Sequence, residues 1–163
     1  QCLVGSEMCI RDRDVQLVQA SVPEVIHRGT RLKSGMIGRL GTGSFVWPVP
    51  GYSGISRWAS LPYGHRGVDI TAPYGTPIYA ADGGRVTYAG YKGAMGYVVI
   101  IDHNNGYVTY YEHNSSLLVS AGQTVYKGQQ VAKAGRSGVA SGVHCHFGIQ
   151  RNGSYVNPLN YLS

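Results

Sequence analysis

The stretch Val143-His144-Cys145-His146-Phe147 places two histidines one residue apart near the C-terminal end of the sequence. Side chains alternate between the two faces of a β-strand, so His144 and His146 are expected side by side on one face. Cys145 then points to the other face, where it is expected to pack in the core as a small apolar residue. The two imidazoles form one half of a candidate metal site.

The other half is His65 and Asp69, which are separated by an even spacing in a glycine-flanked, β-rich setting. That spacing puts both side chains on one face of an extended segment. Catalytic zinc is typically held by three protein ligands and keeps one position for water, whose pKa it lowers toward neutrality. His65, Asp69 and one histidine of the later pair supply such a set, and the other histidine remains for proton transfer in peptide hydrolysis.

The composition describes a turn-rich β protein with one main domain. The chain has 24 glycines and 13 tyrosines, and only 13% of its residues are charged, which favours strands over helices. Two β-prone runs, 97–102 and 107–111, are separated by Asn104-Asn105-Gly106 and predict a hairpin. A short echo between 75–79 and 122–126 hints at a β sandwich or an open barrel. The fold class expected from these patterns is mainly β.

The net charge is +6 with a pI near 9.3, which favours an anionic partner such as an acidic cell-wall polymer. The basic residues are scattered and are not interleaved with stacking aromatics, so we expect no nucleic-acid partner. The longest apolar stretches are strand-sized and interrupted, so no membrane span is expected. We expect a monomer.

The N-terminal part divides into three segments. Residues 1–13 are interpreted as a non-native assembly remnant; two of the three cysteines lie there, so no disulfide framework is indicated. Residues 14–32 alternate in polarity and resemble the closing strand of a G-five module, the C-terminal tail of a small β module. Residues 33–44 have the glycine-rich composition of a linker. The main domain is expected at 45–163.

From Val46 to Leu162 the sequence resembles the lysostaphin-type (LytM-like) zinc endopeptidases, which hydrolyse cross-bridge or stem peptides of bacterial peptidoglycan. The stretches that carry the resemblance are His65-Arg66-Gly67-Val68-Asp69-Ile70, Ala72-Pro73-Tyr74-Gly75-Thr76-Pro77-Ile78, Tyr110 to Asn114, Gly142 to Phe147 and Asn157-Pro158-Leu159-Asn160-Tyr161-Leu162.

This resemblance implies antiparallel sheets with a substrate groove over the zinc site. It implies one Zn²⁺ per chain on His65, Asp69 and His146. It implies that His144 acts as general base or acid and that His113 assists in stabilising the transition state. It also implies a secreted protein in the extracellular space or the cell wall, acting on peptidoglycan peptides.

Five further residues carry expectations of their own. Cys145 and Gly148 stand where the family usually has a larger aliphatic residue and a glutamate, and neither position is a metal ligand. His103 lies at the mouth of the predicted hairpin and is expected at the surface or capping the turn. Tyr63 and Tyr111, close to the expected groove, are candidates for hydrogen bonding to substrate.

Two other functions remain as alternatives. The chain could be a non-catalytic member of the same fold that binds the wall or regulates another hydrolase, and such members typically lose metal ligands. All three proposed ligands and both proposed catalytic histidines are present here, which favours the enzyme. A wall-anchoring module is the third interpretation, and the positive charge does not discriminate it from the enzyme.

Overall fold

The computed structural model describes residues 41–163. The expectations for the assembly remnant, the β-module tail and most of the linker lie outside the described residues. Short strands dominate this part of the chain, and its helices are single turns of 3-10 helix, η2 (Leu61–Tyr63), η3 (Gly93–Met95) and η4 (Pro158–Asn160). The expectation of a mainly β fold is confirmed.

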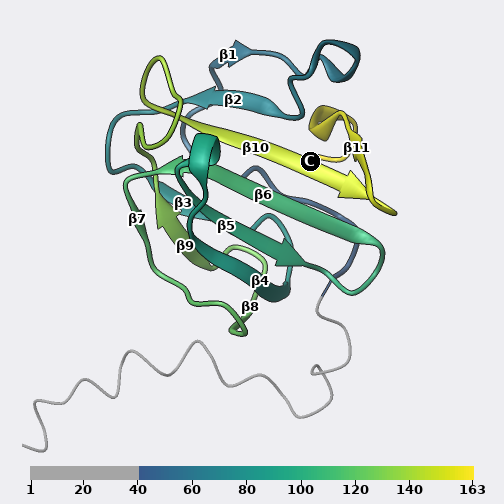
Figure 1. Ribbon diagram of the computed structural model, residues 1–163. Coiled ribbons are helices and arrows are strands. Elements are labelled where there is room, and N and C mark those ends of the chain that lie inside the picture. The colour runs from purple at the N-terminus through teal and green to yellow at the C-terminus, as the bar shows by residue number, and fades with distance from the viewer. Residues whose placement is uncertain (1–40) are drawn as a thin grey trace, which may run out of the picture. The chain divides into compact units, whose positions relative to one another are not determined.

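The larger of two sheets has eight strands in the order β1-β2-β10-β6-β5-β4-β8, with β11 paired to β10 (Figure 1). Every pairing in it is antiparallel. Its strands are β1 (Ile55–Arg57), β2 (Val68–Thr71), β4 (Gly84–Tyr91), β5 (Tyr97–Asp102), β6 (Tyr107–Asn114), β8 (Thr124–Val125), β10 (His144–Arg151) and β11 (Ser154–Val156).

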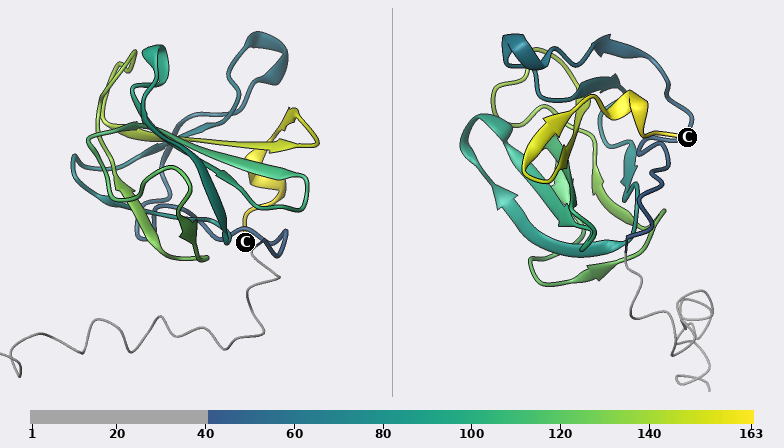
Figure 2. Two further views of the ribbon diagram at one scale, coloured as in Figure 1. Left: turned by 60° about the horizontal axis from the view of Figure 1, so that its bottom comes forward. Right: turned by 90° about the vertical axis from the view of Figure 1, so that its right-hand side faces the viewer.

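The smaller sheet has three antiparallel strands in the order β3 (Pro77–Tyr79), β9 (Gln130–Lys133) and β7 (Ser116–Leu117). It lies to one side of the larger sheet (Figure 2). Ile78 and Ala132 of the smaller sheet are fully buried in the same apolar cluster as Ile101 and Phe147 of the larger one. The two sheets therefore enclose one core, and they remain open, as in a sandwich rather than a closed barrel.

Strand alternation decides which face of β10 meets the core. Cys145, Phe147 and Ile149 are fully buried in the apolar cluster, so the side chains of His144 and His146 lie on the opposite face. The buried Cys145 confirms the expectation for this residue. Burial also raises the pKa of its thiol far above the ordinary range, which keeps the sulfur protonated and inert.

The predicted hairpin is formed by β5 and β6. Its turn contains Asn104 at φ 55° and Gly106 at φ 85°, the left-handed conformation that Asn and Gly adopt most readily. This hairpin carries β6 alongside β10 and brings the Tyr110–Asn114 stretch to the paired histidines. No helix among residues 41–163 is long and apolar enough to cross a bilayer.

Candidate metal centre and groove

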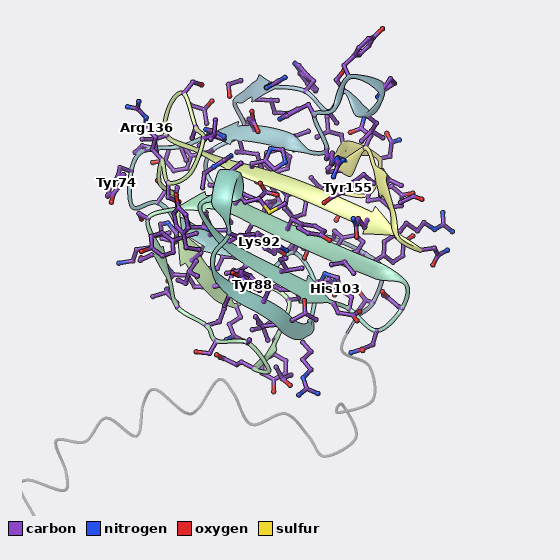
Figure 3. All side chains as sticks on the ribbon, viewed as in Figure 1. Tyr74, Tyr88, Lys92, His103, Arg136 and Tyr155 are labelled. Carbon is purple, nitrogen blue, oxygen red and sulfur yellow. The ribbon has the colours of Figure 1, made fainter. Side chains whose placement is uncertain are left out.

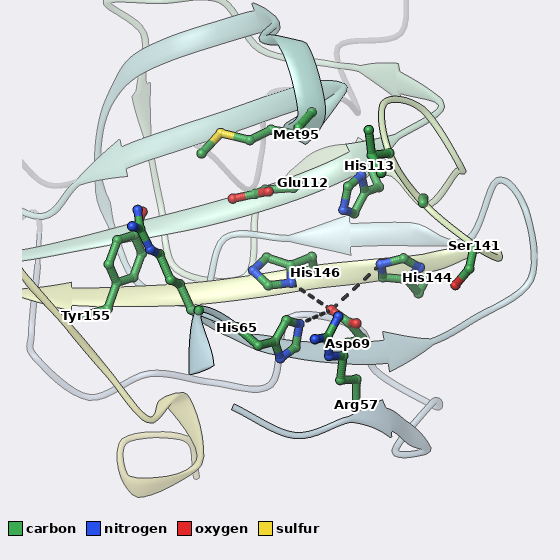
Figure 4. A pocket seen from close by; sticks show the side chains of 15 residues that line it. Arg57, His65, Asp69, Met95, Glu112, His113, Ser141, His144, His146 and Tyr155 are labelled. Carbon is green, nitrogen blue, oxygen red and sulfur yellow. Dashed lines mark hydrogen bonds and ion pairs between the residues drawn. The ribbon is translucent and has the colours of Figure 1, made fainter. Parts of the chain in front are cut away.

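The candidate site forms where β2 and β10 run side by side. Their antiparallel register sets Asp69 opposite His146, and both strands turn alternate side chains away from the core. His65 precedes β2 and is held by a bridge to Ser60. Residues far apart in the sequence thus meet on the outer face of the sheet (Figure 4).

One carboxylate oxygen is the focus of the site. Oδ1 of Asp69 lies 3.0 Å from Nε2 of His65 and 2.7 Å from Nδ1 of His146. Nε2 of His144 is farther away, at 3.7 Å from the same oxygen. The donor atoms of His65, Asp69 and His146 all lie within 4.8 Å of one another, so these three side chains form a compact group and His144 stands beside it.

The hydrogen bonding of His65 tests whether this group suits a metal. Its Nδ1–H donates to the backbone carbonyl of Trp58 at 2.8 Å, which leaves Nε2 as the lone-pair atom of the neutral ring. That lone pair faces the Asp69 oxygen at 3.0 Å. Two acceptors at this distance repel each other unless a proton or a cation lies between them. Two imidazole nitrogens and one carboxylate oxygen are a donor set that zinc accepts, so the group fits the metal.

The ionisation of Asp69 agrees with this role. Burial raises the pKa of the carboxyl group, but the hydrogen bond from His146 and the charges of the surrounding imidazoles outweigh burial. The net effect lowers the pKa below its ordinary value of 3.8. The side chain therefore stays a carboxylate, the form that binds a metal cation.

His113 and His144 stand next to each other on the same groove, with ring centroids 4.8 Å apart. Each donates its Nδ1–H to a backbone carbonyl, His113 to Ser137 at 2.8 Å and His144 to Gly142 at 2.9 Å. These bonds fix the tautomer in which Nε2 carries the lone pair. Both rings are thus prepared to accept a proton at Nε2.

An irregularity in β6 brings His113 to the groove. In the β5–β6 ladder Tyr97 pairs with Asn114 and Val99 with Tyr111, so β6 has one extra residue there, a β-bulge. His113 itself has φ 62°, an uncommon conformation for a residue with a side chain. The amide of Asn114 donates to the carbonyls of Tyr111 and Tyr97 and holds the bulge in place.

The environment of His113 keeps its ring neutral. Burial is the main cause that lowers the pKa of His113, and the neighbouring imidazoles of His144 and His146 lower it further. The hydrogen bond to the Ser137 carbonyl raises the pKa of His113, but by less than burial and the neighbouring imidazoles lower it. A neutral imidazole is the form that can take up a proton during a reaction.

Gly67 allows β10 to approach the segment between His65 and Asp69. A Cβ atom at this position would lie 2.3 Å from the Phe147 carbonyl oxygen and 2.8 Å from Nε2 of His146. No residue with a side chain fits without displacing one of them. The glycine of the His-Arg-Gly-Val-Asp stretch is therefore required by the packing of the site.

The five predicted site residues are all brought together, since His65, Asp69, His113, His144 and His146 line a single groove of about 480 Å³. The groove continues past Asp69 and His144 into a second hollow of about 390 Å³. The cavity residues that sequence reasoning gave no role include Arg57, Arg66, Glu112 and Tyr155.

Glu112 is the most unusual of these residues. It lies opposite His146 in the β6–β10 ladder and is 9% exposed. Burial raises the pKa of its carboxyl group, and the nearby Asp69 adds to the effect, while His146, Lys92 and Arg66 lower it in part. The sequence could have predicted this position, because Glu112 follows Tyr110 by two residues on the same strand. Both side chains therefore lie on the face away from the core.

Two expectations are wrong. His103 is not at the surface: it is 1% exposed, and its ring bonds to the Gly83 carbonyl at 2.7 Å and to Oγ1 of Thr109 at 2.9 Å. Tyr111 does not reach substrate: it is fully buried, and its hydroxyl accepts a hydrogen bond from the Ala81 amide at 2.8 Å. Both are structural: Tyr111 lies on the core face of β6, and Oγ1 of Thr109 on the same face bonds to the His103 ring and to the Tyr111 hydroxyl.

Known proteins are similar to this chain in sequence and in fold. Residues 63–158 match the model of Peptidase family M23. The murein hydrolase activator NlpD of Escherichia coli (strain K12) is 40% identical over 118 residues, which cover 71% of this chain and 30% of that protein. The chain spans less than half the length of the curated relatives at this level of identity.

Two solved structures have the same fold. A zinc-containing peptidase from Vibrio cholerae superposes with a TM-score of 0.64 at 30% identity, covering 73% of this chain and 39% of that chain. The catalytic domain of lysostaphin from Staphylococcus simulans superposes with a TM-score of 0.63 at 26% identity, covering 69% of this chain and 93% of that chain. The family model covers more than half of the 163 residues, and the chain therefore belongs to peptidase family M23.

Proposed function

We propose that this chain is a zinc-dependent endopeptidase that hydrolyses peptide bonds of bacterial peptidoglycan, in the cross-bridge or the stem peptide. The observation that carries the proposal is the convergence of His65, Asp69 and His146 beside two histidines whose Nε2 atoms carry lone pairs, within one groove. The likeness to a zinc-containing peptidase and to the catalytic domain of lysostaphin supports it.

His65, Asp69 and His146 would hold one Zn²⁺ per chain. Zinc bound there supplies a Lewis acid that polarises the peptide carbonyl and lowers the pKa of water. The chain provides a carboxylate that stays ionised and a His65 ring oriented by the Trp58 carbonyl. Such outer partners fix the tautomer and the direction of a metal ligand.

His144 and His113 would handle protons. Nε2 of His144 lies 3.7 Å from the Asp69 oxygen, close enough to accept a proton from water and to return it to the leaving amine. His113, 4.8 Å from His144 between ring centroids, would assist by stabilising charge that develops in the transition state. The carbonyls of Gly142 and Ser137 hold both rings in the required tautomer.

All five side chains come from one chain, so the proposed site is complete in a monomer. The positive net charge would favour association with anionic wall polymers. Relatives are named as lipoproteins and as murein hydrolase activators. These names support a location in the cell envelope or the extracellular space.

The second candidate is a non-catalytic regulator of another murein hydrolase, which would bind wall or protein partners through the same groove. The observation that favours it is the 40% identity to NlpD, which is named a murein hydrolase activator. An activator has no need of a metal group flanked by two oriented imidazoles. The complete set of residues favours the enzyme.

The two functions differ in the products released from purified peptidoglycan. The zinc-loaded chain is incubated with peptidoglycan, and soluble peptides are identified by mass spectrometry for the wild type, His113→Ala and His144→Ala. Cleavage by the wild type alone, with zinc retained in both variants, supports the enzyme. Zinc and wall binding without any released peptide would reject it in favour of the regulator.

A further inference from the structure

Glu112 places its carboxylate at the groove without an ion-pair partner among residues 41–163. It is 9% exposed and lines the groove beside His146. Within residues 41–163 it makes no ion pair, and no hydrogen bond contributes to its ionisation. Its carboxylate oxygens still reach solvent in the groove, since Asn114 Oδ1 is the only fully buried side-chain oxygen or nitrogen without a hydrogen bond in the described part of the chain. A carboxylate that opens only into the groove can accept hydrogen bonds from a ligand there.

Two cationic side chains, Arg66 and Lys92, lie near enough to Glu112 to lower the pKa of its carboxyl group, but each contacts an aromatic ring. The guanidinium of Arg66 stacks over the ring of Tyr155 at 5.2 Å. The ammonium of Lys92 lies over the ring of Tyr88 at the same distance of 5.2 Å, and Figure 3 shows this pair together on the sheet. Each of these arrangements stabilises the cation on an aromatic face. Glu112 is thus available for a partner from outside the chain.

The direction of the side chain separates it from the proton-transfer residues. Figure 4 shows the Glu112 carboxylate between Met95 and His146, directed toward the Tyr155 side of the groove and away from His113. It is therefore placed to contact a bound ligand, next to the group proposed to hold the metal. The groove volume of about 480 Å³ leaves room for a side chain there.

We infer that Glu112 is a specificity residue that binds a primary ammonium group of the peptide ligand, such as that of a lysine side chain. An ionised carboxylate only accepts hydrogen bonds, so its partner must be a donor. An ammonium brings three donors and the opposite charge, which gives the stronger charge-assisted bond. A bridge made of glycine alone would leave Glu112 unpaired. The inference rests on the proposed function only in taking wall peptides as the ligands of this groove.

Binding tests this inference without requiring turnover. Two N-acetylated stem-type peptides, identical except that one has lysine and the other norleucine, are titrated calorimetrically into the zinc-loaded full chain carrying His113→Ala. The lysine peptide should bind about tenfold more tightly, which corresponds to about 1.4 kcal/mol, because its ammonium forms a charge-assisted hydrogen bond with Glu112. Adding Glu112→Gln should reduce the preference to less than about twofold.

Asp102→Asn is the matched control, since it makes the same exchange at a carboxylate that accepts from the Asn104 amide in the hairpin turn. It should leave the lysine preference unchanged. The inference would be overturned if the chain that carries His113→Ala alone bound the two peptides equally well. This outcome does not depend on whether the Glu112→Gln variant folds. A preference that survives in Glu112→Gln would also overturn it.

Cleavage separates this inference from the proposed function. If the unmodified chain cleaves neither peptide nor peptidoglycan, the proposed function fails. A lysine preference that depends on Glu112 would still support the inference in that case. If the unmodified chain cleaves both peptides and Glu112→Gln raises KM for the lysine peptide alone, both proposals are supported.

Discussion

Replacing Gly67 by alanine tests the packing on which the site depends. The added Cβ would lie 2.3 Å from the carbonyl oxygen of Phe147, so one of the two segments must shift by about 1 Å to restore van der Waals contact. The obstacle is the backbone of β10, which cannot rotate away as a side chain can. We therefore expect a cost at the upper end for overpacking, about 3 kcal/mol of unfolding free energy.

The same methyl group would press on the proposed zinc site, because it would lie 2.8 Å from Nε2 of His146. Displacing this ring should weaken zinc binding about tenfold or more, as loss of a supporting contact does.

Calorimetry measures the loss of stability as a fall in Tm of about 10 °C, and competition with a chelating dye measures the zinc affinity. Gly54→Ala is the control, because its Cβ would meet only the Thr71 Cβ at 4.0 Å. Unchanged Tm and unchanged zinc affinity in Gly67→Ala would refute the assigned role of the close approach.

Three further predictions concern the supports of the site and the core. Burial is the main cause that lowers the pKa of His103 in the folded protein. Below about pH 6.5 the unfolded chain therefore binds one more proton than the folded chain. His103 then makes the unfolding free energy fall by up to about 1.4 kcal/mol per pH unit on acidification. Urea unfolding between pH 5 and 7.5 should show a shallower slope for His103→Gln, and identical slopes would contradict the burial of a neutral ring. Ser137→Ala removes a hydroxyl that donates to the Asn114 carbonyl at 2.6 Å and accepts from the Tyr97 amide at 2.9 Å; the rate of peptide release should fall about tenfold through misplacement of His113 with zinc content unchanged, and an unchanged rate would contradict the role of the bulge. Tyr111→Phe leaves the buried Ala81 amide without its acceptor and should cost about 1–3 kcal/mol in chemical denaturation without affecting zinc binding; a stability equal to wild type would show that this bond contributes nothing.

Strand periodicity predicted the centre of the site well. The alternation through His144, Cys145 and His146 places imidazoles on one face and the thiol in the core, and the structure has Cys145 fully buried. The hairpin between β5 and β6 was equally readable, because Asn and Gly have the conformational freedom that its turn requires. Both features, the alternation along β10 and the turn of the hairpin, depend on local backbone geometry. Neighbouring residues determine this geometry, so it can be predicted from the sequence.

The same periodicity fails at His113. In a regular β6 strand His113 would share the face of Thr109 and Tyr111, which are fully buried. The extra residue in β6 shifts this parity, so that Glu112 and His113 both line the groove. The bulge is held by Asn114 through carbonyls on two strands, a tertiary arrangement without a local pattern. The role proposed for His113 was indicated only by the family resemblance.

His103 illustrates the opposite limit. Its neighbours Asp102 and Asn104 suggested an exposed turn, yet the ring is buried against Phe45, with ring centroids 5.4 Å apart. Phe45 lies at the start of the domain sequence, and its backbone pairs with that of Leu162 near the C-terminal end. Burial by such distant segments depends on the tertiary fold, so local sequence predicts it poorly.

In the proposed site His65, Asp69 and His146 bind zinc, and His113 and His144 handle protons. The most direct test is the zinc content per chain, measured by mass spectrometry of the metal after dialysis, for the wild type, His146→Ala and His113→Ala. We predict about one zinc per chain in the wild type and in His113→Ala, and almost none in His146→Ala. A wild-type chain without zinc, or zinc that persists in His146→Ala and is lost in His113→Ala, would contradict the claim.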